Sequence, residues 1–274
     1  MLAARYELLR HQLADGEQTT VYIVYYPRQQ TRLGVEHFPD PQPLDRWCRR
    51  SGIQEAIVGG FFQRPDGPAL GELWIGGRQI ETEPVLDPYA RARAAIYVDE
   101  GEIRIGPRTE LPPRPTGHLL QAGPLLVRDG TPLPYLDDRE GFVAGAHQFD
   151  SDITRGRHPR AALATSDNYL IALVCDGRRT GIDAGLTLTE LAELLAGLGA
   201  REAINLDGGG STALVHRGHL LNRPYGDQDQ PSRPRPIASA AIFNVAASKQ
   251  PAPESAPEQD FCREGAEDRL RWGQ

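Results

Sequence analysis

The sequence predicts a fold rich in short β-strands, with only a few helices. Two observations lead to this prediction. Apolar and β-branched residues gather in short runs that are bounded by turn residues. Glycine and proline are also frequent, with 29 and 23 copies among 274 residues, and both interrupt long helices. The clearest strands are expected at 19–26, 163–165, 169–175 and 238–245, and Asp167-Asn168 predicts a hairpin or meander turn between two of them.

Two helices are expected among these strands. Thr187-Leu-Thr-Glu190 is a capping box, in which the threonine and the glutamate satisfy each other's backbone N–H groups at a helix N-terminus. Leucines then recur at helical spacing up to residue 198, just before Gly199. A weaker pattern predicts a second helix over residues 44–50 that stops at Gly52.

The two predicted helices share a sequence context. Each is followed by a glycine, a short apolar strand and then consecutive glycines, in segments 52–60 and 199–210. This parallel suggests two similar supersecondary units, and internal duplication is a hypothesis that would explain it. If the units are alike, the ends of their strands could lie near each other at one site.

Composition limits the class of protein and its partners. With 39% hydrophobic residues the chain can bury a substantial core, and its net charge of −7 argues against nucleic acid or an anionic membrane as main partner. Three well-separated cysteines fit neither a zinc site nor a disulfide framework. No signal-like or membrane-spanning apolar run occurs, so we expect a cytoplasmic protein, whose oligomeric state the sequence leaves open.

The chain divides into a folded part and a tail. Residues 1–245 carry the strand and helix patterns, and we expect them to form one catalytic domain. Residues 246–274 lack periodicity and are rich in proline, glutamate and alanine, which predicts a disordered C-terminal tail.

Asp207-Gly208-Gly209-Gly210-Ser211 lies between two apolar runs. Three consecutive glycines are costly to order, so we expect a compensating reason such as close approach of a ligand or backbone. Backbone N–H groups in such a loop can face an anion. A flexible turn or bulge is the alternative interpretation. The segment is not a nucleotide P-loop, because no lysine follows the glycines.

Asp207 and Asn205 would point to the same side of a strand, because alternate strand residues share a face. The carboxylate could act as a general acid or base or bind a cation, and the amide could bind a sugar hydroxyl or a phosphate oxygen. Alternatively, Asp207 only caps its own turn. A divalent cation such as Ca²⁺ or Mg²⁺ is an open possibility, although no dense carboxylate loop indicates one.

Arg155-Gly-Arg157-His158-Pro159-Arg160 is a candidate anion clamp, because the planar fork of arginine can donate two hydrogen bonds to one phosphate. The alternative is a solvated basic turn that pairs with Asp150 and Asp152. Further candidates are the Gly59-Gly60-Phe61-Phe62 segment, Gln121 in a turn-bounded strand, and the Arg233-Pro-Arg235-Pro loop. Segment 59–62 could form a close backbone approach followed by aromatic rings that stack on a sugar, or a bend that leads into the core.

Gly59-Gly-Phe-Phe, Gln121-Ala-Gly-Pro, Arg157-His-Pro-Arg and Asn205-Leu-Asp-Gly-Gly-Gly-Ser-Thr together resemble, in this order, the motif series of phosphodiester glycosidases. The resemblance runs from about Val21 to Val245, and Asp-Gly-Gly-Gly-Ser is its most specific part. It implies an α+β domain with a mixed, strongly curved sheet. It also implies hydrolysis of a small sugar phosphodiester to free sugar and a phosphomonoester.

The resemblance places most of these candidates around the substrate. We expect Arg160 and Arg233 to hold the phosphate, Asp207 to be the acid, base or nucleophile, and His158 to be a second proton-transfer group. If two carboxylates are required, Glu55 or Asp176 could supply the second. The predicted catalytic residues are Asp207 and His158, and the predicted substrate-binding residues are Asn205, Gly208, Gly209, Gly210, Ser211, Thr212, Arg157, Arg160, Arg233, Gly59, Gly60 and Gln121.

Two positions depart from the family pattern. Val58 replaces the usual asparagine before the glycine pair, and Ala161 replaces the threonine that commonly follows His-Pro-Arg. Both changes remove hydrogen-bonding capacity, which predicts an altered substrate or lost catalysis. The alternatives to a hydrolase are therefore a non-catalytic carbohydrate- or phosphate-binding protein on the same scaffold, and a glycosyl transferase that uses an acceptor other than water.

Overall fold

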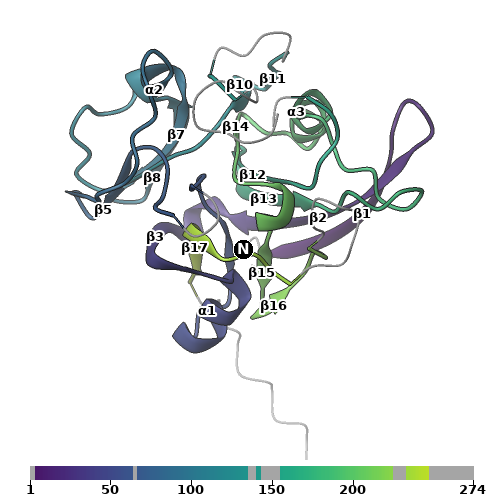
Figure 1. The fold of residues 1–274 in the computed structure, drawn as a ribbon, viewed down its shortest axis with the longest axis horizontal. Coiled ribbons are helices and arrows are strands. Elements are labelled where there is room, and N and C mark those ends of the chain that lie inside the picture. The colour runs from purple at the N-terminus through teal and green to yellow at the C-terminus, as the bar shows by residue number, and fades with distance from the viewer. Residues whose placement is uncertain (1–3, 64–66, 135–139, 143–154, 225–232, 247–274) are drawn as a thin grey trace, which may run out of the picture.

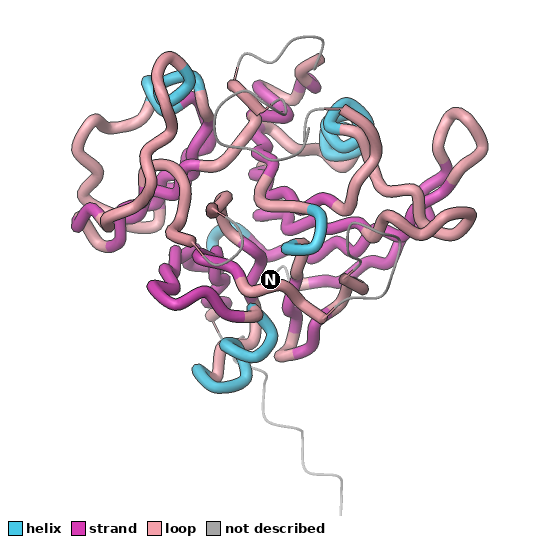
Figure 2. The backbone as a smooth tube through the Cα atoms, viewed as in Figure 1, coloured by secondary structure: helices cyan, strands magenta, loops and turns pink. Residues whose placement is uncertain are grey.

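The computed structural model describes residues 4–63, 67–134, 140–142, 155–224 and 233–246. Strands and loops make up most of this part of the chain, and helices are few and short (Figure 2). The expected tail lies almost wholly outside these ranges, as do Asp150 and Asp152, so those two predictions remain predictions. Within the same ranges, no helix is both long and apolar enough to cross a membrane.

The largest sheet has seven strands in the order β1-β2-β13-β12-β14-β10-β11 (Figure 1). Their bounds are β1 Arg5–Gln12, β2 Gln18–Pro27, β13 Tyr169–Cys175, β12 Arg160–Thr165, β14 Glu202–Asn205, β10 Leu125–Arg128 and β11 Thr131–Pro132. The expected strands at 19–26, 163–165 and 169–175 are confirmed. The expected hairpin is also confirmed, because β12 and β13 pair antiparallel on either side of Asp167-Asn168.

Two five-stranded sheets complete the fold. The first has the order β16-β15-β4-β17-β3, with β16 His219–Leu220, β15 Leu214–His216, β4 Ala56–Val58, β17 Ile237–Val245 and β3 Thr31–Gln42. The second has the order β6-β5-β9-β7-β8, with β6 Arg78–Gln79, β5 Leu73–Ile75, β9 His118–Gln121, β7 Ala94–Asp99 and β8 Glu102–Pro107. The ladders are antiparallel, and the parallel pairing is a single bridge from Leu70 to Glu83.

In the described ranges, three α-helices and three short 3₁₀ turns connect the strands. The helices are α1 Leu44–Ser51, α2 Tyr89–Ala92 and α3 Leu188–Gly197, and the 3₁₀ turns are Arg28–Gln30, Arg108–Glu110 and Gly209–Ser211. Both helix predictions are confirmed. Gly52 ends α1 in the left-handed conformation at φ 70°, and Thr187 and Glu190 form the expected capping box.

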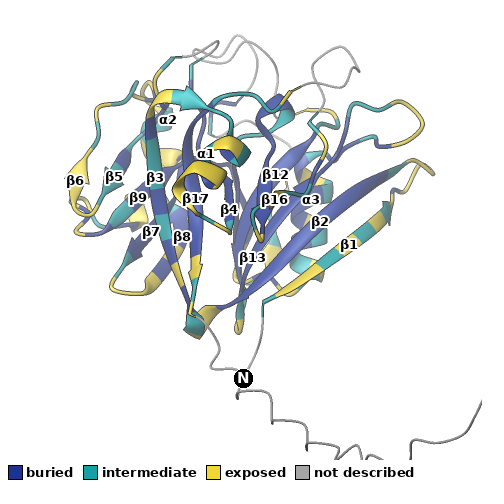
Figure 3. Ribbon diagram, turned by 90° about the horizontal axis from the view of Figure 1, so that it is seen from below, coloured by how far each residue is buried: buried dark blue, intermediate teal, exposed yellow. Residues whose placement is uncertain are grey.

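The overall architecture confirms the expected α+β class. The strands curl into a half-barrel with few helices, because each sheet twists and the three meet around a shared interior (Figure 1). The central strands β2, β12 and β13 are buried on both faces, whereas the edge strand β1 is largely exposed (Figure 3). One face of the seven-stranded sheet packs on α3, and the other face packs on the two smaller sheets.

Candidate functional site

The ends of several strands meet at one place. The backbone N–H of Asp207, just past β14, donates to the carbonyl of Gly59, just past β4, over 3.0 Å. Leu206 N donates to Ala161 O of β12 over 2.8 Å. The two helix-strand-glycine segments therefore do come together, as their parallel sequence context suggested. Residues almost 150 positions apart become neighbours because β4 and β14 end at the same rim.

Asp207 opens the glycine turn at this rim. It is half-buried, and its Oδ1 accepts a hydrogen bond from Gly208 N over 2.9 Å. The carboxylate therefore caps its own turn, as the alternative interpretation expected. This contact also holds the carboxylate beside the first glycine of the turn, where it could take part in a reaction.

The amides of the glycine turn are mostly used within the protein. Gly208 N binds Asp207, Gly209 N donates to Pro159 O over 2.8 Å, and Ser211 N donates to Gly208 O over 3.1 Å. Within the described part of the chain, no backbone acceptor binds Gly210 N. The geometry therefore gives little support to an anion site made of three glycine amides, and it leaves Gly210 as the candidate donor.

Close approach explains part of the glycine content. A Cβ atom on Gly208 would lie 2.8 Å from Pro159 O, and Gly209 has φ 58°. Pro159 is held from its other side too, because a Cβ on Gly177 would lie 2.7 Å from Pro159 N. The His158-Pro-Arg segment is thus packed between the glycine turn and the loop after β13. Gly208 therefore satisfies the expectation of a close backbone approach, and Gly177 makes a second one on the other side of Pro159.

Asn205 is buried beneath the turn and does not reach its exposed side. It is 2% exposed, and its Nδ2 donates to Gly123 O over 3.2 Å and to Leu206 O over 2.8 Å. The amide therefore fastens the Gly123-Pro124 turn to β14. Its Oδ1 is buried without a hydrogen-bond partner. A direct role in substrate binding finds no support in this arrangement.

Ser211 and Thr212 are buried at the end of the turn, with 2% and 1% exposure. Thr212 O accepts from Asn222 Nδ2 over 2.8 Å, which fixes the turn to the strand pair β15 and β16. The Ser211 hydroxyl accepts a long 3.5 Å contact from Arg235 Nη1. Both residues stabilise the end of the turn through these contacts.

Gly59 and Gly60 are enclosed by protein. A Cβ on Gly59 would lie 2.5 Å from Ser239 Oγ and 2.8 Å from its backbone, and a Cβ on Gly60 would lie 2.7 Å from Gln121 O. Both amides bind Ser239, Gly59 N through its carbonyl and Gly60 N through its hydroxyl. The predicted close approach is present, but the approaching group is the protein's own backbone. The alternative of a bend into the core describes this pair better.

Gln121 is an internal crosslink. It is 4% exposed, its Oε1 accepts from Glu72 N over 2.9 Å, and its Nε2 donates to Ala90 O over 2.6 Å. Both ends of the side-chain amide are engaged by backbone groups of the third sheet's loops. The prediction that Gln121 contacts substrate therefore finds no support in the geometry.

The predicted arginine clamp separates into residues with different roles. All three guanidinium nitrogens of Arg157 bind carboxylates: Nε and Nη2 contact Glu190 and Nη1 contacts Asp15. Arg157 thus ties this segment to the capping box of α3. Two nitrogens of the buried Arg160 donate to the carbonyls of Leu186 and Gly156. These protein partners argue against Arg157, and weaken the case for Arg160, as phosphate ligands.

His158 lies beside the turn. Its backbone forms a bridge with Leu186, with N···O distances of 3.2 and 3.1 Å in the two directions. The residue is half-buried and directly precedes Pro159, whose carbonyl binds Gly209 N. This position is compatible with the proton-transfer role that the sequence predicted. Arg155, three residues earlier, is exposed.

Two arginines outside the predicted substrate-binding set lie against the glycine turn. Arg178 Nη2 is 3.1 Å from the position of a Cβ on Gly209, and Arg235 Nη2 is 2.6 Å from that of Gly210. Arg233, which was selected, is exposed. Proline-bounded Arg235 was visible in the sequence. Arg178 could have been found because it lies two residues after Asp176, which directly follows β13. Strand β13 pairs with β12, the strand next to the turn.

The two candidates for a second carboxylate lie in different places. Glu55 precedes β4, at the end opposite to Gly59, and its Oε2 contacts Tyr26 OH and His216 Nδ1. Asp176 follows β13 and is 1% exposed; Tyr22 OH and Arg223 N donate to its two oxygens. Burial raises the pKa of Asp176 to about 6. Of the two, Asp176 is on the rim that carries the turn.

In the ranges that the structure covers, no group of three or more His, Cys, Asp or Glu side chains is arranged to hold an ion. Residues 143–154, with two aspartates near the site in sequence, lie outside those ranges. The possible Ca²⁺ or Mg²⁺ ion remains a prediction.

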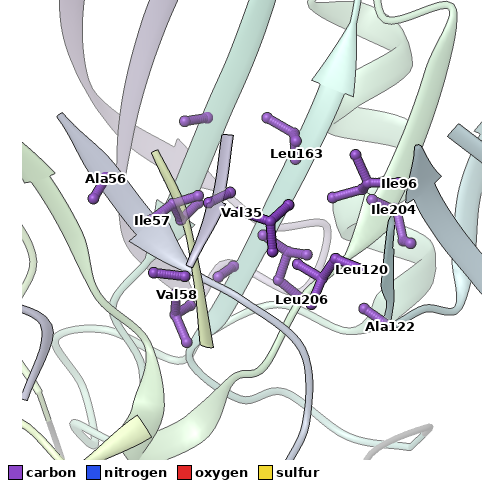
Figure 4. Packing of buried hydrophobic residues seen from close by; sticks show 14 of the residues in the cluster. Val35, Ala56, Ile57, Val58, Ile96, Leu120, Ala122, Leu163, Ile204 and Leu206 are labelled. Atoms are coloured by element: carbon purple, nitrogen blue, oxygen red, sulfur yellow. The ribbon is translucent and has the colours of Figure 1, made fainter. Parts of the chain in front are cut away.

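The departures from the family pattern lie in the core. Val58 and Ala161 are both 0% exposed and belong to the main apolar cluster, where Val58 packs among neighbours such as Ile57 (Figure 4). Leu206 joins the same cluster from β14. Val58 and Ala161 therefore lack hydrogen-bonding groups in the packed interior. They do not remove such groups from the exposed side of the turn.

The comparisons with known proteins give the family to which this fold and glycine turn belong. Residues 51–244 match the family model for phosphodiester glycosidase, and the chain belongs to this family. This span contains Asp207 and both glycine segments.

Curated relatives are enzymes with a stated substrate class. The chain is 28% identical over 194 residues to the Bos taurus N-acetylglucosamine-1-phosphodiester alpha-N-acetylglucosaminidase, covering 66% of this chain and 34% of the relative. The Mus musculus enzyme of the same name is 29% identical over 182 residues, covering 64% and 34%. The chain thus spans about a third of the length of these relatives.

Solved structures show the same fold. The catalytic domain of the zebrafish enzyme of that name, described as auto-inhibited by its pro-peptide, aligns with TM-score 0.66 at 17% identity, covering 89% of this chain and 83% of that one. A putative exported protein from Burkholderia pseudomallei aligns with TM-score 0.62 at 14% identity, covering 83% and 74%. These likenesses concern the fold alone, and they confirm the curved sheet that the resemblance implied.

Proposed function

We propose that this chain hydrolyses a glycosyl-1-phosphodiester, with Asp207 as the reacting carboxylate. One observation carries the proposal: the family's glycine turn folds so that Asp207 lies where the ends of β14 and β4 meet, fixed by Gly59 O and Gly208 N. Family membership and the activity named for the Bos taurus and Mus musculus relatives support the reaction class.

In the proposed reaction, water bonds to the anomeric carbon and the bond from that carbon to the phosphate oxygen breaks. The products are free sugar and a phosphomonoester. Asp207 acts as nucleophile, or as the base that removes a proton from water. His158, beside the turn, is the proposed second proton-transfer group, because the ordinary pKa of histidine lies near neutrality.

The buried position of Val58 and Ala161 supports a working site rather than a lost one. Their side chains belong to the apolar cluster, so their lack of polar groups does not remove a ligand contact from the exposed side of the turn. A binding protein or a transferase would be recognised from the products of the experiment below.

The test is release of free sugar from a panel of sugar-1-phosphodiesters, including UDP-N-acetylglucosamine, by wild type and Asp207→Asn. Asp167→Asn is the matched control, since Asp167 is an exposed aspartate paired with Arg201 on the far hairpin. We expect release by wild type and the control, and a loss of at least about 1,000-fold in Asp207→Asn, as is usual for an essential reacting group. A chelator arm tests the possible cation.

Binding without release from any substrate would contradict the proposal and favour a binding protein. Transfer of the sugar to an added acceptor, with no free sugar, would instead indicate a transferase. Undiminished release by Asp207→Asn would remove this residue from the reaction.

A further inference from the structure

Guanidinium groups from two separate loops lie against the glycine turn. Around the position that a Cβ of Gly209 would occupy, Nη2, Nη1 and Cζ of Arg178 lie at 3.1, 3.3 and 3.5 Å. Around that of Gly210, Nη2, Cζ and Nε of Arg235 lie at 2.6, 2.9 and 3.1 Å. A methyl group at Gly210 would displace the guanidinium of Arg235, and one at Gly209 would press on that of Arg178. The second and third glycines therefore let both guanidinium groups lie close to the turn.

Local backbone geometry directs Arg178 to the turn. Arg178 has φ 57°, a left-handed conformation that is uncommon for a residue with a side chain. The next residue, Arg179, goes elsewhere: its Nη1 contacts the buried Asp183 over 2.8 Å, and its backbone pairs with the same residue. The strained position thus separates two consecutive arginines, one that binds the protein's own carboxylate and one that faces Gly209. Strain of this kind often accompanies functional sites.

Arg235 reaches the turn from another direction. It lies two residues before β17, between Pro234 and Pro236, which restrict the backbone on both sides. Its long contact with Ser211 Oγ, 3.5 Å from Nη1, places the guanidinium over the end of the turn. Arg178 and Arg235 are both half-buried. Partial burial strengthens the interaction of a guanidinium with an anion, because water screens the charge less.

The arginines of the His-Pro-Arg segment bind protein groups. Every guanidinium nitrogen of Arg157 contacts Glu190 or Asp15, and two nitrogens of Arg160 donate to main-chain carbonyls. The guanidinium groups that lie against Gly209 and Gly210 belong to Arg178 and Arg235.

We propose that Arg178 and Arg235 bind the phosphate group of the substrate from the two sides of the glycine turn, with Gly210 N as an additional donor. This inference rests on the proposed function for the identity of the anion. Planar guanidinium groups donate paired hydrogen bonds to phosphate oxygens, and they also stabilise the charge that the departing phosphate gains. Asp207, in the same turn, would then face the adjoining sugar carbon.

The test measures binding of inorganic phosphate by calorimetry to wild type, Arg178→Gln, Arg235→Gln and the double variant. Arg201→Gln is the control, because it removes the same charge from an exposed pair with Asp167. We expect Kd to rise about tenfold or more in each single variant and about 100-fold in the double variant, with Arg201→Gln near wild type. Lysine at either position should recover part of the affinity, since it keeps the charge but loses the planar fork.

Urea unfolding of the same variants separates binding from a structural role. A Kd within twofold of wild type in both single variants would overturn the proposal, as would the absence of measurable phosphate binding by wild type. Loss of stability with unchanged Kd would make the arginines structural, which also overturns it.

The outcome is independent of the sugar-release assay. If phosphate affinity depends on Arg178 and Arg235 but no sugar is released, the phosphate-binding proposal stands and the hydrolase proposal fails. If sugar is released and the Arg178→Gln and Arg235→Gln variants have the KM of wild type, the hydrolase proposal stands and the phosphate-binding proposal fails.

Discussion

The two glycine segments of this protein follow similar strands and meet at one rim, yet they are glycine for different reasons. Gly59-Gly60 follows β4. Fixed groups, namely Ser239 and the backbone of Gln121, occupy the space that their Cβ atoms would need. Gly209 and Gly210 instead face the far ends of two arginine side chains, which can move. The first segment needs glycine for packing, whereas the second needs it to admit guanidinium groups. A glycine run therefore indicates close approach, but the approaching atoms decide its role.

The largest effect is expected at Gly59. In Gly59→Ala the new methyl group would meet the Ser239 hydroxyl and backbone at 2.5 to 2.8 Å, and neither can move without shifting β17. We expect the free energy of unfolding to fall by about 3 kcal/mol or more, as for overpacked cores. Urea unfolding measures it.

Gly197→Ala is the control for this variant, because a Cβ there, near the end of α3, meets nothing within 4 Å. It should leave stability equal or slightly higher. If Gly59→Ala unfolds at the same urea concentration as this control, the rim at Gly59 is adaptable and the contrast between the two segments disappears.

A second prediction concerns Asp176, whose loop packs on Pro159 behind the glycine turn. Burial raises its pKa to about 6, above the value near 3.9 of an exposed aspartate, and Asp183, Arg179, Tyr22 and the Arg223 backbone surround it. Between about pH 4 and 6 the folded protein holds a proton that the unfolded chain has lost. Stability conferred by the protonated carboxyl is therefore lost as pH rises, by up to about 1.4 kcal/mol per pH unit.

Asp176→Asn should remove this slope, so that the wild-type and variant unfolding free energies diverge by at most roughly 3 kcal/mol between pH 4 and 7. Unfolding in urea at each pH unit measures the difference. Parallel curves for the two proteins would mean that Asp176 titrates normally.

The sequence predicted the elements well where the signal was local. The capping box at Thr187 and Glu190, the Gly52 stop of α1 and strand β13 all depend on neighbouring residues, and the structure confirms each. The curved sheet required the family resemblance, because strand order depends on contacts distant in the chain. Helical and strand patterns alone did not give the three-sheet arrangement.

The site was harder to predict from sequence. Residue type drew attention to Asp207 and the glycine turn, but it could not show which arginines lie against the turn. Arg157 carries the more obvious motif, and its partners Asp15 and Glu190 are far away in the chain. Asn205 and Gln121 were selected as polar groups near motifs, and the structure buries both in hydrogen bonds to backbone. Only tertiary contacts could reveal these assignments.

The central claim is that the glycine turn is the place where the substrate's phosphate meets Arg178 and Arg235. Gly210→Ala tests it most directly, because the backbone there suits alanine and the new methyl group would displace Arg235, whose guanidinium lies 2.6 Å from it. The measurement is Kd for phosphate beside the free energy of unfolding. The account predicts a Kd about tenfold higher with stability within about 1 kcal/mol of wild type. An unchanged Kd, with stability lost as in Gly59→Ala, would contradict it and make both glycine segments packing devices.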